Sequence, residues 1–263
     1  MEKIIVPGTD YGSYSHTKVC EMSLTNDNVF NNFKRIPQFE RVLEHTTEYN
    51  GHQYASAIIN RFNRYFKQLN WDKLKENDKY GNARIIDFPE LELINNHYSP
   101  STIHYIFTSL FFIDNILSKM NNINLLEIGG GYGGLCKVLL DICQMLNVKI
   151  ENYGLIDLQE ASRLQNKYLS NFNFKNIQHY EYENQLDYDV FKKYNVMLSI
   201  YAFGEFPFNV QDYYVKNIIS HFENYYIEWN TERTHPHFQD ATILPEDPPT
   251  WPLNKSILKI KKK

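Results

Sequence analysis

The sequence predicts an α/β fold in which a mostly parallel sheet ends in an antiparallel hairpin and follows a helical region. From Leu125 onward, short apolar runs alternate with amphipathic stretches, which is the pattern of strands and helices in a parallel sheet. A run of glycines within residues 129–134 stands where the first of these strands gives way to a helix. In the tail, two short apolar runs flank a proline-rich turn, which is typical of a hairpin.

The strands and helices of the sheet region follow from the spacing of their apolar residues. The stretch 125–130 is predicted to be a buried strand that ends in glycines, and apolar residues at helical spacing predict a helix over 134–146. Four further strands are predicted at 152–158, 177–182, 196–201 and 225–229. Helices are predicted over 161–169 and from about 210 to 222, and the tail from Ala241 to Lys263 forms the hairpin.

The chain is predicted to divide into a mainly helical region, residues 1–120, and a ligand-binding domain, residues 121–263. In the first region, apolar residues at helical spacing predict a helix over 54–69. A second helix is expected to begin near Ser101, because the Ser-Pro pair at 99–100 supplies a capping residue and a proline for the first turn. We expect this region to cover the site or to make contacts between subunits.

Composition and charge narrow the class of protein. Of the 263 residues, 43% are hydrophobic and 22% are charged, so the chain can fill a core. The formal net charge is −4, whereas domains that bind phosphate backbones are usually strongly basic, so nucleic acid is not an expected partner. No apolar run approaches the roughly 20 residues of a bilayer span, and the start of the chain lacks the apolar core of a signal peptide. We therefore expect a cytoplasmic protein with no membrane partner.

The glycine turn is compatible with two kinds of ligand. Glycines tolerate positive φ and let a ligand approach the backbone, and the following helix offers free N–H groups. Gly129, Gly131 and Gly134 satisfy the dinucleotide pattern G-x-G-x-x-G. Glu127, followed by glycines at 129, 131 and Gly133, satisfies the acid-x-G-x-G-x-G pattern of methyltransferases that use S-adenosylmethionine. The glycines alone do not decide between the two.

Three further features favour S-adenosylmethionine. Glu127 can face the positively charged amino acid end of this ligand, a group that a pyrophosphate lacks. Asp157 ends the next strand, thirty residues after Glu127, where an acid can accept hydrogen bonds from both ribose hydroxyls, a role common to both ligands. Only about a hundred residues follow Asp157, which leaves little room for the separate substrate domain of most dehydrogenases.

The motifs LLEIGGGYGGL and LIDL, together with the closing hairpin, resemble class I S-adenosylmethionine-dependent methyltransferases, with their Rossmann-like sheet, over residues 121–263. More narrowly, SPSTIHY, EIGGGYGGL, YGLIDLQE, SIYAFGEF and LPEDPPT resemble the sugar O-methyltransferases found in surface-glycan gene clusters. The resemblance implies methyl transfer to a hydroxyl of a sugar, either a nucleotide-linked or a glycan-bound deoxysugar.

The resemblance also implies which residues contact the cofactor. Residues 98–102 would form part of a lid over it, and Tyr201 can lie against the methyl donor. The methionine half, the ribose and the adenine would be contacted, in that order along the chain, by Glu127, Gly129, Gly130, Gly131, Gly133, Asp157, Leu158, Tyr182 and Glu183.

A general base is expected in the loops after the fourth and fifth strands, because ligands sit beyond the carboxyl ends of parallel strands. After the fourth strand, Glu205 can act as a base or bind sugar hydroxyls, and the Pro-Pro motif of many amino-group methyltransferases is absent, which favours an oxygen acceptor. After the fifth strand, His235 is the first candidate base and His237 the second; exposed loop histidines are the alternative interpretation. With Asp240 they could hold a divalent metal, but magnesium prefers oxygen ligands, so we expect none.

Three other functions stay open from the sequence. A NAD-binding oxidoreductase would need a hydride acceptor site in the remaining residues. A non-catalytic protein that keeps the fold as a scaffold would not need Glu127 and Asp157. A protein or RNA methyltransferase is disfavoured by the acidic balance of the chain.

Overall fold

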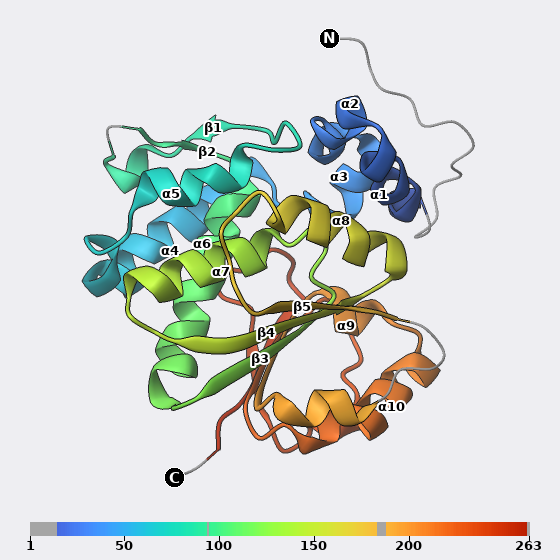
Figure 1. Ribbon diagram of the computed structural model, residues 1–263. Helices are drawn as coiled ribbons and strands as arrows, with labels where there is room; N and C mark the ends of the chain where they lie inside the picture. The colour runs from blue at the N-terminus through green and yellow to red at the C-terminus, as the bar shows by residue number, and fades with distance from the viewer. Residues whose placement is uncertain (1–14, 94, 183–187, 262–263) are drawn as a thin grey trace.

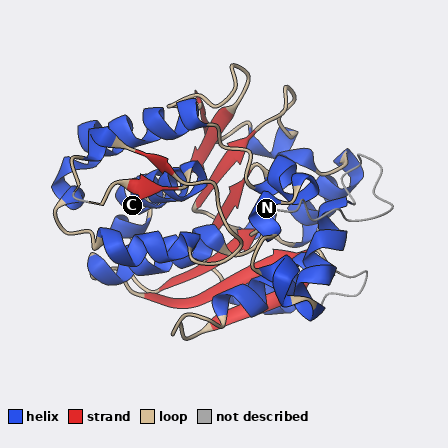
Figure 2. Cartoon of the chain, turned by 90° about the horizontal axis from the view of Figure 1, so that it is seen from above, coloured by secondary structure: helices blue, strands red, loops and turns tan. Residues whose placement is uncertain are grey.

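The computed structural model describes residues 15–93, 95–182 and 188–261. Within them, seven strands form one sheet in the order β5-β4-β3-β6-β7-β9-β8, and helices cover both of its faces (Figures 1 and 2). The strands are β3 (Ile123–Ile128), β4 (Ile150–Asp157), β5 (Ile177–Glu181), β6 (Val196–Ile200), β7 (Tyr225–Trp229), β8 (Thr242–Pro245) and β9 (Lys255–Lys259). A separate two-stranded sheet pairs β1 (Ile86–Asp87) with β2 (His97–Tyr98).

The remaining elements are helical. The α-helices are α1 (Ser15–Thr25), α2 (Asp27–Phe30), α3 (Pro37–Leu43), α4 (Glu48–Phe66), α5 (Trp71–Lys75), α6 (Pro100–Asn115), α7 (Gly134–Met145), α8 (Gln159–Leu169), α9 (Ala202–Glu205) and α10 (Phe208–Asn217). Short 3-10 turns cover Phe33–Arg35, Glu76–Asp78, Pro89–Leu91, Leu117–Lys119, Tyr188–Lys193, Ile219–His221 and Pro236–Phe238. No helix in the described ranges is long and apolar enough to cross a bilayer.

The predicted fold class is confirmed. Strands β3 to β7 pair in parallel, whereas β9 runs antiparallel to both β7 and β8. The chain leaves β3 for β4 on one side and returns to β6 on the other, so the carboxyl end of β3 is the switch point where ligands bind in such sheets. The predicted hairpin is present, with its second strand inside the sheet and its first at the edge.

Two of the element boundaries that differ from the prediction have clear local reasons. The first strand of the sheet spans residues 123–128 instead of 125–130, because Gly129 has φ +76 and leaves the extended conformation. The helix predicted over 210–222 is interrupted at Ile218, whose φ of −126° and ψ of −56° are not helical. The chain continues from there as a 3-10 turn.

Alternate side chains of the strands enter two cores. The first core lies between the sheet and helices α6, α7 and α8. The second core lies between the opposite face of the sheet and α10 (Figure 1). On β3, Leu125 belongs to the first core and Leu126 to the second. On β7, Tyr226 faces the first core and Trp229 the second. Since side chains two apart share a face, Glu127 and Glu228 both lie on the face of the first core.

The N-terminal helices pack onto this first face. Helix α4 contacts α6, and α1 contacts α8, so their apolar residues join the same core as the sheet. Helix α6 begins as predicted, with Ser99 as the N-cap that accepts a hydrogen bond from the Thr102 N–H at 3.0 Å. Helix α4 begins at Glu48, earlier than predicted, because Thr47 caps it.

Candidate active site

The glycine turn after β3 needs glycine at several positions. Gly129, Gly131 and Gly133 have φ values of +76, +59 and +91, a region that other residues rarely adopt. A Cβ on Gly129 would lie 2.0 Å from the Cβ of Ala202. The contact between these two residues joins the turn to the end of β6. The backbone of the turn is therefore bare at the switch point of the sheet.

Asp157, at the end of β4, holds this turn in place. Its Oδ2 accepts hydrogen bonds from the Gly131 N–H at 3.0 Å and from Gln165 Nε2 at 2.9 Å. Its Oδ1 accepts one from the Leu158 N–H at 2.8 Å. Burial raises the pKa of Asp157 to about 6, although these hydrogen bonds oppose the shift. Because a carboxylate oxygen accepts two hydrogen bonds, Oδ1 can still accept one from a ligand hydroxyl.

Glu127 lies beneath the turn on the face of the first core. Its Oε2 accepts a hydrogen bond from the Tyr153 hydroxyl at 2.6 Å. A Cβ on Gly130 would lie only 3.5 Å from the Glu127 carboxyl carbon, so this carboxyl is next to the bare backbone. Burial raises its pKa to about 7. A buried carboxyl in this state gains most from a cationic ligand, which would ionise it.

Tyr201 follows β6 and connects the turn with the hairpin. Its φ is +59, a strained value for a tyrosine. The Tyr201 N–H donates to the Glu228 carbonyl at 2.9 Å, and its hydroxyl bonds to Glu246 and, at 3.0 Å, to Thr250. The next residue is Ala202, which touches Gly129. These contacts keep the Tyr201 ring beside the turn.

A buried histidine and carboxylate pair lies next to Tyr201. His104 Nε2, on α6, is 3.2 Å from Glu228 Oε2, on β7. The other carboxylate oxygen of Glu228 accepts hydrogen bonds from Thr108 at 3.1 Å and from Tyr226 at 2.9 Å. Because a carboxylate only accepts hydrogen bonds, Nε2 is the protonated nitrogen of the neutral ring. The Nδ1 atom of His104 is then the nitrogen that can accept a proton.

Aromatic rings surround this pair. His104 stacks on Tyr54 with ring centroids 4.5 Å apart, and it lies 5.9 Å from the Tyr201 ring. On the other side, the His45 ring lies 5.6 Å from Tyr201, and its Nδ1–H donates a hydrogen bond to the Val42 carbonyl at 3.1 Å. The segment before α4 therefore contributes a ring beside Tyr201, and the covering role expected for the helical region stays a prediction.

His235 lies on the opposite face, in contact with the second core. Its Nε2 is 2.9 Å from Asp212 Oδ1, and its Nδ1 accepts a hydrogen bond from the His237 N–H at 3.1 Å. The ring stacks on Phe208, with centroids 5.2 Å apart. Both ring nitrogens are thus occupied by the protein. The catalytic role expected for His235 stays a prediction, and these contacts give it a structural role as well.

The other two candidate bases have neighbours other than the dyad of His104 and Glu228. Burial, together with the charges of Lys259 and His235, lowers the pKa of His237, and its Nε2 is buried without a hydrogen-bond partner among the described residues. Glu205 Oε1 accepts a hydrogen bond from Asn230 Nδ2 at 2.6 Å. The charge of Glu205 also acts on His45, beside Tyr201, and the catalytic roles of Glu205 and His237 stay predictions.

Of the residues expected around adenine, the structure describes Leu158 and Tyr182. The Tyr182 N–H donates to the Asp157 carbonyl at 2.7 Å, and the Tyr182 ring stacks on Tyr214 at 5.6 Å. Leu158 is 38% exposed although it is apolar, which leaves an apolar surface beside Asp157. Glu183 lies outside the described residues.

No three metal-ligating side chains gather in the part of the chain that the structure describes. The trio of His235, His237 and Asp240, considered from the sequence, does not form such a group there.

Sequence reasoning missed the pair of His104 and Glu228, although two signals for it were present. Glu228 is an acid inside the apolar strand YYIEW, and His104 stands among apolar residues in TIHYIFTSLFF. A buried carboxylate needs hydrogen-bond partners, so each of these polar residues required a partner on a neighbouring element.

Comparison with known proteins gives likenesses of fold only. No family model and no curated protein matches the chain. The CMeT domain of the citrinin polyketide synthase is 12% identical, with 85% of this chain and 68% of that one aligned and a TM-score of 0.47. The methyltransferase domain of bacterial CtHen1 is 11% identical (59% and 96% aligned, TM-score 0.45), and the plantazolicin methyltransferase BpumL, solved with SAH, is 13% identical (82% and 59%, TM-score 0.38). Because likenesses at this level do not identify a family, a proposal of function has to stand on the site itself.

Proposed function

We propose that this protein is an S-adenosylmethionine-dependent O-methyltransferase that acts on a sugar hydroxyl. The observation that carries the proposal is the convergence of three features at one switch point. These features are the bare glycine turn, the Asp157 carboxylate that holds it, and the buried Glu127 carboxyl beneath it. A pyrophosphate would meet two carboxyl groups there, whereas S-adenosylmethionine presents a cation and two ribose hydroxyls.

The residues of the turn fit each part of this cofactor. Glu127 would face the ammonium group, and the spare acceptor capacity of Asp157 Oδ1 would take a ribose hydroxyl. The exposed apolar side chain of Leu158 would lie against adenine. When bound, the cofactor supplies a methyl group on a positively charged sulfur that leaves as a neutral thioether.

The remaining task of the protein is to position the acceptor and to take its proton. His104 is suited to this task because Glu228 fixes its tautomer and would stabilise the imidazolium after proton transfer. The acceptor oxygen gains the methyl group, and its proton passes to His104 Nδ1. Tyr201, between this ring and the turn, would align the acceptor with the methyl group.

A sugar is the acceptor class that the sequence motifs favour. The surrounding groups agree with it, since Thr250 and Glu246 offer hydrogen-bonding oxygens and the rings of His45 and Tyr201 offer apolar faces. The absence of a Pro-Pro motif after β6 adds weight to an oxygen acceptor.

Two experiments test the proposal. Calorimetry should show S-adenosylmethionine binding to the wild-type protein and none to Asp157→Ala, with the fold intact by circular dichroism. If NAD binds and S-adenosylmethionine does not, the oxidoreductase alternative holds. Labelled S-adenosylmethionine with a panel of sugars and nucleotide sugars should then reveal turnover. If the cofactor binds without turnover on any acceptor, the scaffold alternative gains support.

A further inference from the structure

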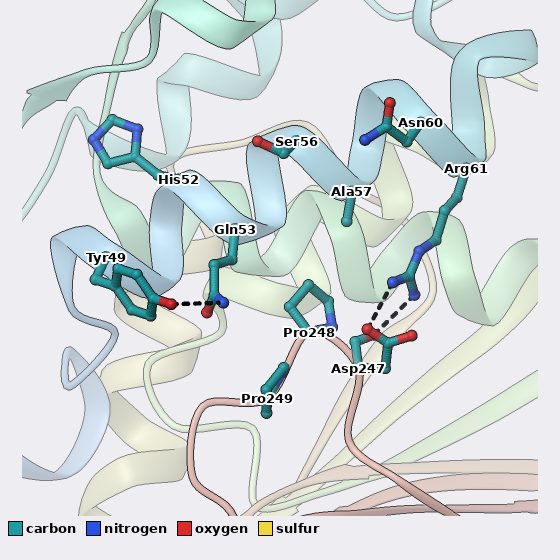
Figure 3. A pocket seen from close by; sticks show the side chains of 10 residues that line it. All are labelled: Tyr49, His52, Gln53, Ser56, Ala57, Asn60, Arg61, Asp247, Pro248 and Pro249. Atoms are coloured by element: carbon teal, nitrogen blue, oxygen red, sulfur yellow. Dashed lines mark hydrogen bonds and ion pairs between the residues drawn. The ribbon is translucent and has the colours of Figure 1, made fainter.

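A groove of about 400 Å³ lies between α4 and the hairpin loop, next to the proposed site (Figure 3). Side chains from four successive turns of α4 form one wall, and the Asp247-Pro248-Pro249 segment forms the other. The residues that line it are Tyr49, His52, Gln53, Ser56, Ala57, Asn60, Arg61, Asp247, Pro248 and Pro249.

The charged groups of this groove are already paired. Arg61 Nη2 lies 2.6 Å from Asp247 Oδ1 and closes one end of the groove. His52 Nδ1 lies 2.7 Å from Glu90 Oε1. Among the described lining residues, therefore, no cation is left for a phosphate group, which normally recruits unpaired arginine or lysine. A nucleotide diphosphate is a poor match for this surface.

The remaining polar groups are neutral and available. In the part of the chain that is described, the side chains of Ser56 and Asn60 make no hydrogen bond to protein. Gln53 donates its Nε2 to the Tyr49 hydroxyl at 3.2 Å, but its Oε1 is buried without a partner. Because this Oε1 is closed off from solvent, a rotation of the Gln53 amide has to turn it into the groove before a ligand hydroxyl can satisfy it.

Apolar surfaces accompany these polar groups. Ala57 and the rings of Pro248 and Pro249 line the groove between them, and Tyr49, at one end, is 71% exposed. Amides and hydroxyls beside ring faces match a sugar unit, whose hydroxyls lie at its rim and whose C–H groups lie on its faces.

The same loop connects the groove with the dyad. Glu246 bonds to the Tyr201 hydroxyl, and the following residue is Asp247, which lines the groove. Asn50 Nδ2 donates to the Pro249 carbonyl at 3.4 Å and helps to hold the loop on α4. One step along this loop, from Glu246 to Asp247, therefore leads from the Tyr201 hydroxyl to the wall of the groove.

We propose that this groove binds a second, uncharged sugar unit of the acceptor. The acceptor is then an oligosaccharide or glycan chain, and the methylated unit is not carried by a nucleotide. This inference rests on the proposed function, because it concerns the acceptor of that reaction.

The test measures binding of named probes to the full chain. Neutral di-, tri- and tetrasaccharides, their monosaccharides, UDP-glucose and dTDP-rhamnose are titrated by ligand-observed NMR. We expect at least one oligosaccharide to bind at least tenfold more tightly than its monosaccharide. Ser56→Trp, which fills the groove, should remove that gain, while Asn63→Trp, at an exposed position of α4 outside the groove, should keep it. The double variant Gln53→Ala/Asn60→Ala gives a milder version of the same loss.

The outcomes separate this inference from the proposed function. Calorimetry with S-adenosylmethionine is run on the same samples, with thermal unfolding to show that each variant folds. If the cofactor binds but no oligosaccharide does, or if Ser56→Trp binds as tightly as wild type, the groove assignment is overturned and the proposed function stands. The same holds if a nucleotide sugar binds best and depends on Ser56. If wild type does not bind the cofactor, the proposed function fails.

Discussion

The two faces of the sheet each carry a histidine paired with a carboxylate, and the two pairs differ in the burial of the carboxylate and in whether the second ring nitrogen is engaged. On the first face, His104 lies 3.2 Å from Glu228, whose side chain is 3% exposed. On the second face, His235 lies 2.9 Å from Asp212, whose side chain is 58% exposed. The shorter pair has the less suitable surroundings, because the second nitrogen of His235 is also engaged. Distance alone does not identify a general base.

Replacement of each histidine by glutamine is the most direct test of the difference between the two pairs. His104→Gln should lower turnover by about 10²- to 10⁴-fold, the usual contribution of a general base. His235→Gln should lose stability and keep turnover per folded molecule. The measurement is the initial rate with labelled S-adenosylmethionine, with cofactor affinity measured in parallel and expected to stay unchanged. Equal rates for His104→Gln and wild type would return the role of base to His235.

Removal of each carboxylate tests how much the burial of the pair contributes to stability. Glu228→Ala would leave the donors of His104, Thr108 and Tyr226 without their shared acceptor in the first core, so we expect a loss of about 3–5 kcal/mol in unfolding free energy from three unsatisfied buried groups. Asp212→Ala removes an exposed partner, for which about 1 kcal/mol or less is expected. Urea titration of both variants measures the difference. Equal losses would contradict the contrast between the faces.

The first face should also respond to pH through Glu127. Burial raises the pKa of Glu127 from its ordinary value of 4.5 to about 7, so the group must lose a proton when a cationic ligand binds. Cofactor affinity should therefore rise by up to about tenfold per pH unit below pH 7 and level off above it. Below pH 6 the change should steepen, since the pKa of Asp157 is raised to about 6.

Stability of the free protein should change in the opposite direction. The folded state binds the Glu127 proton more tightly than the unfolded state does, so this contribution is complete below pH 4.5 and is lost as pH rises to about 7. Glu127→Gln should flatten both curves in this range. Calorimetry with S-adenosylmethionine and urea titration, each from pH 5 to 8.5, measure them. A wild-type affinity that does not vary with pH would exclude Glu127 as the partner of the ammonium group.

The sheet and the glycine turn could be predicted because their signals are local. Strand periodicity, the run of glycines after β3 and the acid at the end of β4 can each be read from a few consecutive residues. The start of α4 could not be predicted, because its first residues, 48–53, are mostly polar and show no apolar residues at helical spacing. The capping Thr47 marks it instead.

Each residue of the dyad stands out as a polar residue in an apolar segment, but their pairing could not be predicted because they are 124 positions apart. Only the packing of α6 on β7 brings them together, and no spacing rule describes that contact. His235, in contrast, was a candidate base because several polar residues stand near it in the sequence. Its partner is Asp212, 23 positions earlier and on α10. The hydrogen-bond partner of His235 could therefore not be predicted from the residues next to it in the sequence.

Removal of one hydroxyl gives the finest test of the contrast between the faces. Tyr201→Phe on the first face deletes the bonds to Glu246 and Thr250, and Tyr180→Phe, beside the second core, deletes bonds to Gln178 and Tyr194. Each should cost about 1–2 kcal/mol of stability, the usual effect of a lost hydrogen bond that leaves a buried partner.

Only Tyr201→Phe should also change catalysis, because its hydroxyl holds the hairpin loop against the site. We expect a several-fold rise in the KM for the acceptor with cofactor affinity unchanged, since the Glu127 and Asp157 contacts do not involve Tyr201. Steady-state kinetics with calorimetry on both variants measures this. If Tyr180→Phe raises the KM equally, the effect comes from general loss of stability, and the two faces do not differ in the way that their histidines indicate.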